Sequence, residues 1–127
     1  MKVICLSASL RFEKEIETII NQSEKVGITA LFPNFPVTED KDYLTVEKMK
    51  KLCQDHFNAI TQAEALYVIN PGGYIGTLVK IEIGFALGKN KPVYFSHSTD
   101  AVDLDSLSTG VIPLDSLEEF LGIKTRN

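Results

Sequence analysis

Residues 64–96, EALYVINPGGYIGTLVKIEIGFALGKNKPVYFS, constrain the fold more than any other part of the chain. Positions 65–69 form a short apolar run that ends at the turn-forming residues 70–73, so a buried strand fits better than a helix. The spacing then predicts a helix over 76–88 and a second strand over 93–95. Two parallel strands joined by a crossover helix place the glycine loop at the carboxyl edge of the sheet, where open α/β sheets bind ligands.

The remaining segments extend this pattern. Further strands are predicted over 2–6, 28–32 and 111–112, and further helices over 12–25, 45–62 and 115–121. Residues 96–109 are polar and predict a long loop, which we expect to reach a neighbouring subunit. The expected fold is a Rossmann-like (flavodoxin-like) α/β three-layer sandwich with a parallel sheet of about five strands, built as one domain over residues 1–127.

The apolar positions predict which helix faces point inward. On the helix over 76–88 these positions are Leu78, Ile81, Phe85 and Ala86. On the helix over 45–62 the stripe comprises Val46, Met49, Leu52, Cys53, Phe57 and Ile60. Both stripes are expected to pack on the sheet.

Charge and composition exclude several classes of function. The net charge is −4, which argues against a nucleic-acid partner, because such surfaces need concentrated basic residues. No apolar run is long enough to cross a membrane, and the start reads as a strand and not as a signal peptide. Cys5 and Cys53 are isolated and the two histidines lie far apart, so no metal site is expected. We therefore expect a cytoplasmic protein.

Glu82 is the first candidate for chemistry. It lies between Ile81 and Ile83, about a turn and a half into the helix that follows the glycine loop. A carboxylate there can project into the cleft above the sheet; the alternative is a solvated helix residue. Glycines let backbone N–H groups approach an anion, and a helix amino end favours negative charge. Such a glycine pattern also occurs in plain turns.

Polar residues at two other strand ends form a second candidate group. Ser7, Ser9 and Arg11 follow the first strand and suit phosphate binding, since the guanidinium donates two hydrogen bonds at once. Ser9 can equally be a helix N-cap. Asn34 and Phe35 follow the second strand, where they can contact a base or sugar or form a rigid surface loop.

His56 lies in the carboxyl half of the helix over 45–62, beside its apolar stripe. One interpretation is a surface histidine stabilised by the helix dipole. The other is a functional histidine that transfers protons near neutral pH.

With these residues in place, the chain resembles the nucleoside 2-deoxyribosyltransferase-like superfamily, and in particular its small bacterial relatives. The resemblance is carried by VINPGGYIGTLVKIEI, residues 68–83, and covers most of the chain. It implies a Rossmann-like sheet, a homodimer or higher homo-oligomer with sites near subunit contacts, and cleavage or exchange of the N-glycosidic bond of a nucleoside or nucleoside 5′-monophosphate. No metal or other cofactor is implied.

The resemblance also implies roles for single residues. Glu82 matches the nucleophilic glutamate, and Ser7, Ser9 and Arg11 match the segment that meets the 5′-phosphate in the nucleotide-hydrolase branch. The rest of the phosphate and substrate pocket falls on Gly72, Gly73, Tyr74, Gly76 and Thr77, and Ser106 matches a polar residue donated by the neighbouring subunit.

Three positions depart from the transferases of this superfamily. Their helix aspartate corresponds to His56, which we predict to protonate the departing base in its place. Their strand-one tyrosine corresponds to Cys5, and an acidic residue six places before the nucleophile corresponds to Gly76. These replacements favour a hydrolase or a nucleotide binder over a base-exchanging transferase.

Two rival interpretations stay open. The PGGxGTxxE motif of the lysine-decarboxylase-like phosphoribohydrolases is similar to PGGYIGTLVKIE, but Tyr74-Ile75 replaces one residue and Glu82 lies too far beyond Thr77. A non-catalytic nucleotide-binding or sensor protein can keep the glycine loop and Arg11 without turnover.

Overall fold

The computed structural model describes residues 2–33, 45–117 and 119–121. Its centre is one sheet of five parallel strands in the order β2-β1-β3-β4-β5. The strands are β1 (Val3–Ser7), β2 (Thr29–Leu31), β3 (Ala65–Val68), β4 (Val93–Phe95) and β5 (Gly110–Val111). This order reverses direction between β1 and β3, as in flavodoxin-like folds, and it confirms the predicted fold class.

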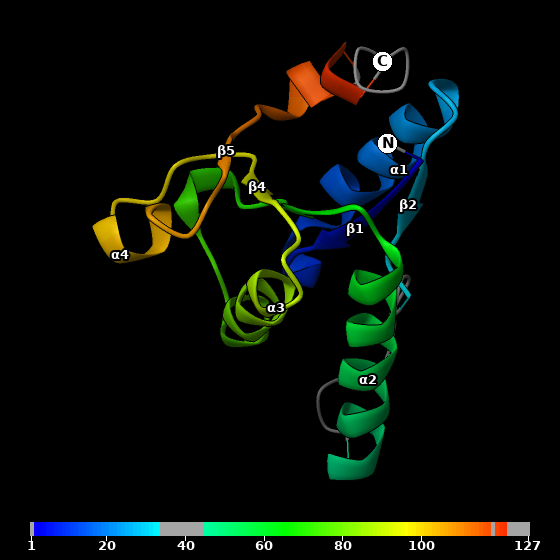
Figure 1. Cartoon of the computed structure of the whole chain (residues 1–127), viewed down its shortest axis with the longest axis vertical. Coiled ribbons are helices and arrows are strands. Elements are labelled where there is room, and N and C mark those ends of the chain that lie inside the picture. Colours follow the sequence, from blue (N-terminus) through cyan, green and yellow to red (C-terminus); the bar gives the residue numbers. More distant parts are fainter. Residues whose placement is uncertain (1, 34–44, 118, 122–127) are drawn as a thin grey trace.

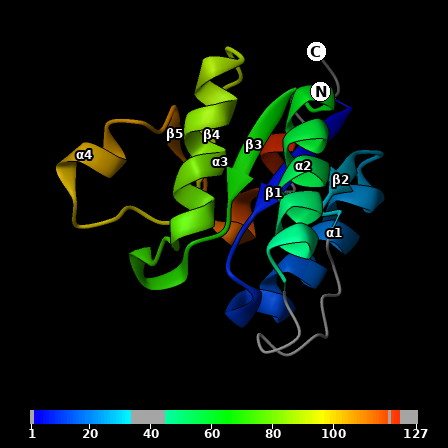
Figure 2. The ribbon, with the colours of Figure 1, turned by 90° about the horizontal axis from the view of Figure 1, so that it is seen from below.

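The helices lie on both faces of this sheet (Figures 1 and 2). They are α1 (Glu13–Lys25), α2 (Val46–Gln62), α3 (Thr77–Gly88) and the short α4 (Val102–Asp105). The described residues also contain the 3-10 turns η1 (Leu10–Phe12), η3 (Pro71–Gly73) and η4 (Leu114–Ser116), and they are helical again at 117 and 119–121. Residues 96–109, predicted as a loop throughout, therefore contain one helical turn, and the predicted helix over 115–121 begins as a 3-10 turn.

Local sequence accounts for the helix boundaries. The Thr45 side chain accepts a hydrogen bond from the backbone N–H of Lys48 and so caps α2. Acidic residues in the first turn of α1 and Lys25 in its last turn complement the helix dipole. Gly27 follows with a φ of 77°, a conformation that glycine adopts at low cost after a helix.

The core forms one layer on each face of the sheet, because alternate strand residues point to opposite sides. Ile4 and Leu6 of β1 pack with Ile16 and Ile19 of α1. Cys5 packs on the other face, with buried residues of α2 and α3 that include Ala59, Ile60, Val79, Ile83 and Ala86. Ser7 shares the face of Cys5 by the same alternation, so its side chain points toward α2 and α3.

The prediction of the inward face of α3 was wrong in part. Leu78 and Ile81 are 44% and 52% exposed, whereas Val79 and Ile83 are buried. Because Val79, Glu82, Ile83 and Ala86 follow the spacing of one helix face, Glu82 is carried inward with the core residues.

The stripe predicted on α2 also packs differently from expectation. Val46 is 73% exposed, and only the carboxyl half of the helix contributes buried residues. Figure 1 shows that the first turns of α2 extend beyond the end of the sheet, so none of the described strands lies beside them. None of the described helices is long and apolar enough to cross a membrane.

Candidate active site

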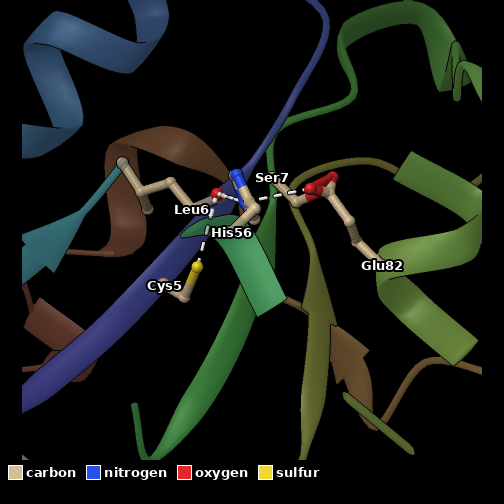
Figure 3. Close-up of polar contacts among 5 residues, drawn as sticks. All are labelled: Cys5, Leu6, Ser7, His56 and Glu82. Atoms are coloured by element: carbon tan, nitrogen blue, oxygen red, sulfur yellow. Dashed lines mark hydrogen bonds and ion pairs between the residues drawn. The ribbon is translucent and has the colours of Figure 1, made fainter. Parts of the chain in front are cut away.

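Three elements bring Glu82, Ser7 and His56 together at the carboxyl edge of the sheet (Figure 3). The Ser7 hydroxyl, at the end of β1, donates a hydrogen bond of 2.6 Å to Oε1 of Glu82 on α3. Nε2 of His56, on α2, lies 3.2 Å from Oε2 of Glu82. The Glu82 side chain is 12% exposed, so its carboxyl group is held from two sides and still reaches open space.

His56 is buried and not a surface histidine. Its Nε2 lies 2.8 Å from the carbonyl oxygen of Leu6, which can only accept, so Nε2 carries the proton. The edge of the Phe32 ring packs against the imidazole, with 5.5 Å between the ring centroids. Burial lowers the pKa of His56, and the bond to Leu6 opposes that shift only in part. The imidazole is therefore a neutral donor near pH 7.

Burial has the opposite effect on the carboxyl group. It raises the pKa of Glu82 from its ordinary value of 4.5 to about 7, against the bond from Ser7, which lowers the pKa. The pKa of the nearby Cys5 thiol is raised by burial and then by the charge of Glu82, so Cys5 stays a thiol. A carboxyl group that ionises near neutrality can act either as a nucleophile or as an acid.

Glu82 opens onto a cavity of about 720 Å³ between α2, α3 and the end of β1. This volume lies within the range of roughly 300–1,000 Å³ that is usual for small-molecule sites. The lining residues are Ala8, Ser9, Leu10, Phe32, Met49, Leu52, Cys53, His56, Phe57, Gly76, Thr77, Leu78, Val79, Ile81 and Glu82.

The structure gathers five of the predicted site residues in this cavity, namely Ser9, His56, Gly76, Thr77 and Glu82. Ser9 also accepts a bond of 3.4 Å from the backbone N–H of Arg11 and caps η1, so both of its predicted roles fit the geometry. Gly76 precedes α3 without a side-chain cap, and α3 has no acidic residue in its first turn. This helix end is therefore a suitable place for an anion.

Ser7 lies elsewhere than expected. It is fully buried and its hydroxyl is engaged with Glu82, so contact with a phosphate does not fit the geometry. The physical reason is strand alternation, which turns Ser7 toward α3, whereas Ser9 follows the end of the strand and faces the cavity.

Arg11 and Tyr74 lie beside each other, and neither lines the cavity. The Arg11 guanidinium carbon is 3.8 Å from the centroid of the Tyr74 ring, a cation–π contact between the segment after β1 and the glycine loop. Phe12 meets the same ring edge-on, with 6.2 Å between the centroids. The guanidinium is exposed and can still donate to an anion outside the cavity mouth.

Gly72 and Gly73 shape the turn that precedes α3. Their φ angles are 69° and 80°, which glycine tolerates best. A Cβ on Gly73 would come within 3.1 Å of the carbonyl oxygen of Ser98, so this turn packs directly on the chain after β4. Ser106 is exposed at the end of α4, where its hydroxyl donates to the carbonyl of Asp103, and it does not line the cavity. Asn34 and Phe35 lie outside the described residues.

Sequence reasoning missed a polar network that holds the glycine turn. Asn70 is fully buried, and its Nδ2 donates to the carbonyl of His97 over 2.8 Å. Its Oδ1 accepts from the backbone N–H of His97 and from the Ser96 hydroxyl. The position of Asn70 directly after a buried strand could have predicted this network, because a buried amide side chain needs hydrogen-bond partners and the neighbouring strand end can supply them.

Among the described residues, no group of three histidine, cysteine or acidic side chains could hold a metal ion. The arrangement supplies one desolvated carboxyl group, a hydroxyl donor that orients it, an imidazole nitrogen 3.2 Å from it and a largely apolar cavity in front of it. Such a group can attack an electrophilic carbon, or hold a substrate without reaction.

Comparison with known proteins gives matches to solved structures only. No protein-family model and no curated protein sequence matches the chain. The 2-deoxyribosyltransferase of Bacillus psychrosaccharolyticus superposes with a TM-score of 0.69 at 15% identity, over 91% of this chain and 90% of that one. The Clostridium botulinum CMP N-glycosidase BcmB gives a TM-score of 0.62 at 17% identity, over 97% and 99%.

A conserved protein from Enterococcus faecalis V583 gives a TM-score of 0.63 at 21% identity, over 100% and 99% of the two chains. These matches extend over nine-tenths or more of each chain, and the first two agree with the resemblance drawn from residues 68–83. The chain therefore has the nucleoside 2-deoxyribosyltransferase-like fold, which it shares with N-deoxyribosyltransferases and nucleotide N-glycosidases.

Proposed function

We propose that the protein hydrolyses the N-glycosidic bond of a nucleoside or nucleoside 5′-monophosphate, with Glu82 as the nucleophile. The proposal depends on the Glu82 carboxyl group, which accepts a hydrogen bond from Ser7, lies 3.2 Å from Nε2 of His56 and lines a cavity of about 720 Å³. The activities named for two solved structures of the same fold support it.

The proposed reaction has two steps, formation of a glycosyl ester on Glu82 and its hydrolysis. A carboxylate oxygen of Glu82 bonds to C1′ of the sugar while the C1′–N bond breaks, and the electron pair of that bond stays on the base nitrogen. The base takes a proton from solvent, leaving a glycosyl ester on Glu82. Water then attacks C1′, the ester oxygen leaves with its electron pair, and the proton lost by the water returns to solvent.

We assign His56 a positioning role in this reaction. Its Nε2 proton is already donated to Leu6, and burial lowers its pKa, so the neutral ring is a poor acid near pH 7. The same N–H lies 3.2 Å from Oε2 of Glu82 and stabilises the ionised carboxylate. The role predicted from the sequence, protonation of the base, requires an imidazolium that this environment disfavours.

A 5′-phosphate is proposed to bind where Ser9, Thr77 and the amino end of α3 meet, with Arg11 at the mouth. Arg11→Ala is then expected to weaken monophosphate binding at least tenfold and nucleoside binding less than twofold, because a guanidinium–phosphate bond contributes about 1.5–3 kcal/mol. Isothermal titration calorimetry measures both constants. Lys14→Ala, an exposed cation on α1, is the matched control. Equal losses for nucleoside and monophosphate would contradict this assignment.

We also propose a homo-oligomer in which the segment around α4 contacts a second copy. Val102 is 87% exposed and Leu107 is 40% exposed, on either side of Ser106. Apolar side chains grouped in this way favour an interface. Sedimentation of the wild type and of a Val102→Asp variant tests this; a monomeric wild type would contradict it.

The principal experiment is incubation with ribo- and deoxyribonucleosides and their 5′-monophosphates, followed by chromatography for free base. Glu82→Gln is expected to remove base release, whereas Glu17→Gln, an exposed carboxylate on α1, leaves it unchanged. A 2-deoxy-2-fluoro substrate analogue is expected to leave a sugar adduct on the peptide that contains Glu82, detected by mass spectrometry. Base release that survives in Glu82→Gln would refute the mechanism, and nucleotide binding without any base release would favour the binding-protein alternative.

A further inference from the structure

The cavity in front of Glu82 has polar side chains on one side and apolar side chains on the other. Besides His56 and Glu82, its polar lining side chains are Ser9, which follows β1, and Thr77 at the amino end of α3. On the side of α2 the lining consists of side chains with no charge and no strong hydrogen-bonding group, namely Phe32, Met49, Leu52, Cys53 and Phe57. A substrate with its phosphate near Thr77 and its sugar at Glu82 would therefore direct its base toward this apolar wall.

The apolar wall extends along α2 and is packed against α3. Met49, Cys53 and His56 share one face of α2, and seven residues at the rise of an α-helix correspond to about 10 Å between Met49 and His56. The first turns of α2, which include Met49, extend past the sheet (Figure 1). Phe57 stacks on Phe85 of α3, with 4.5 Å between the centroids, and closes the side between the two helices.

Two hydrogen-bonding side chains between the wall and Glu82 are already engaged. His56 donates through Nε2 to the carbonyl of Leu6, and the buried Ser7 hydroxyl donates to Glu82. Among the described lining residues there is no asparagine, glutamine, arginine or lysine to read the polar edge of a base. Selection on this wall therefore acts through apolar area and shape.

We propose that the site selects nucleotides whose base carries an apolar substituent, in preference to the unsubstituted base. This inference rests on the proposed function for the placement of sugar and phosphate. Each buried methylene strengthens binding by roughly fourfold, whereas a polar group that loses water without a new partner weakens it. An alkyl group on the base ring fills the apolar part of the cavity and adds no polar group that needs a partner.

A homologous series tests the proposal: deoxyuridine 5′-monophosphate and its 5-methyl and 5-propyl derivatives, which differ only in apolar size. Dissociation constants are measured by calorimetry on Glu82→Gln, so that turnover does not interfere, and by thermal shift on the wild type. We expect binding to strengthen about threefold with methyl and at least tenfold with propyl.

Met49→Gln, a nearly isosteric polar change on the wall, is expected to reduce the propyl preference at least threefold. Lys51→Gln introduces the same residue on the exposed side of α2 and is expected to leave it unchanged. Equal or weaker binding of the alkyl derivatives, or a preference that Met49→Gln does not alter, would overturn the proposal.

Base release from the same compounds by the wild type is measured separately. Release without alkyl preference in binding would refute this inference and leave the proposed function standing. Alkyl preference in binding without release would refute the function and support the inference.

Discussion

Glu82 is expected to lower the stability of the protein as the pH rises, and its replacement by glutamine is expected to remove that effect. The folded state raises the pKa of Glu82 from 4.5 to about 7, so between these values the folded protein holds a proton that the unfolded chain has released. Stability contributed by the protonated form is complete below pH 4.5 and is lost as the pH rises to about 7. Each pKa unit corresponds to about 1.4 kcal/mol, which gives a loss of about 3 kcal/mol at pH 8.

Glutamine cannot ionise, and it keeps an oxygen for the Ser7 hydroxyl. The free energy of unfolding of Glu82→Gln, minus that of the wild type, is therefore expected to increase by about 2 kcal/mol between pH 5 and pH 8. Replacing the carboxyl group also changes the contact of residue 82 with His56. That change adds an offset of about 1 kcal/mol to the difference between the two proteins, and the offset is the same at every pH. Carboxyl groups distant from Glu82 titrate in both proteins, and their contributions cancel in the difference.

Urea unfolding at pH 5, 6, 7 and 8, followed by far-ultraviolet circular dichroism, measures the difference. With a urea dependence of roughly 1–3 kcal/mol per molar, the midpoint of the variant is expected to move ahead of the wild type by about 1 M over this range. Glu17→Gln, on the exposed face of α1, is expected to follow the wild type. A difference that stays constant from pH 5 to pH 8 would refute the inference that burial raises the pKa of Glu82.

Two further predictions concern the groups around this carboxylate. Ser7→Ala is expected to lower kcat/KM by about 10- to 100-fold, because a bond to a charged group contributes about 1.5–3 kcal/mol. The Ser7 bond lowers the pKa of Glu82, so the rise of activity with pH, expected near pH 7 in the wild type, is expected at higher pH in the variant. An unchanged pH–rate profile would argue that Ser7 does not act on the carboxylate. Gly73→Ala is expected to cost about 2–3 kcal/mol, and Gly72→Ala about 1 kcal/mol, measured by thermal unfolding, because both need positive φ but only a Cβ on Gly73 meets backbone atoms, the nearest being the Ser98 carbonyl oxygen. Equal losses for the two variants would refute the close packing of this turn.

Much of the fold could be predicted because its signals are local. Apolar runs bounded by turn residues located the strands, and the crossover pattern implied a parallel sheet, which the structure confirms. The position of Glu82 after the glycine loop made it a candidate for chemistry, and the resemblance carried by residues 68–83 implied its role as the nucleophile. The apolar spacing on α3 was less informative, because that helix has apolar residues on every side and several choices of inward face fit it equally well.

What the sequence determined by itself was therefore the order of the elements and the residue on which the chemistry is proposed to depend. Only the tertiary structure decided which neighbours that residue has. Ser7 and His56 reach Glu82 from 75 and 26 positions away, since strand alternation turns one side chain toward α3 and the packing of α2 buries the other. The same packing raised the pKa of Glu82 and placed four residues of the predicted α2 stripe in a cavity wall, while Ile60 of that stripe joined the core, because burial depends on what lies opposite a side chain in space.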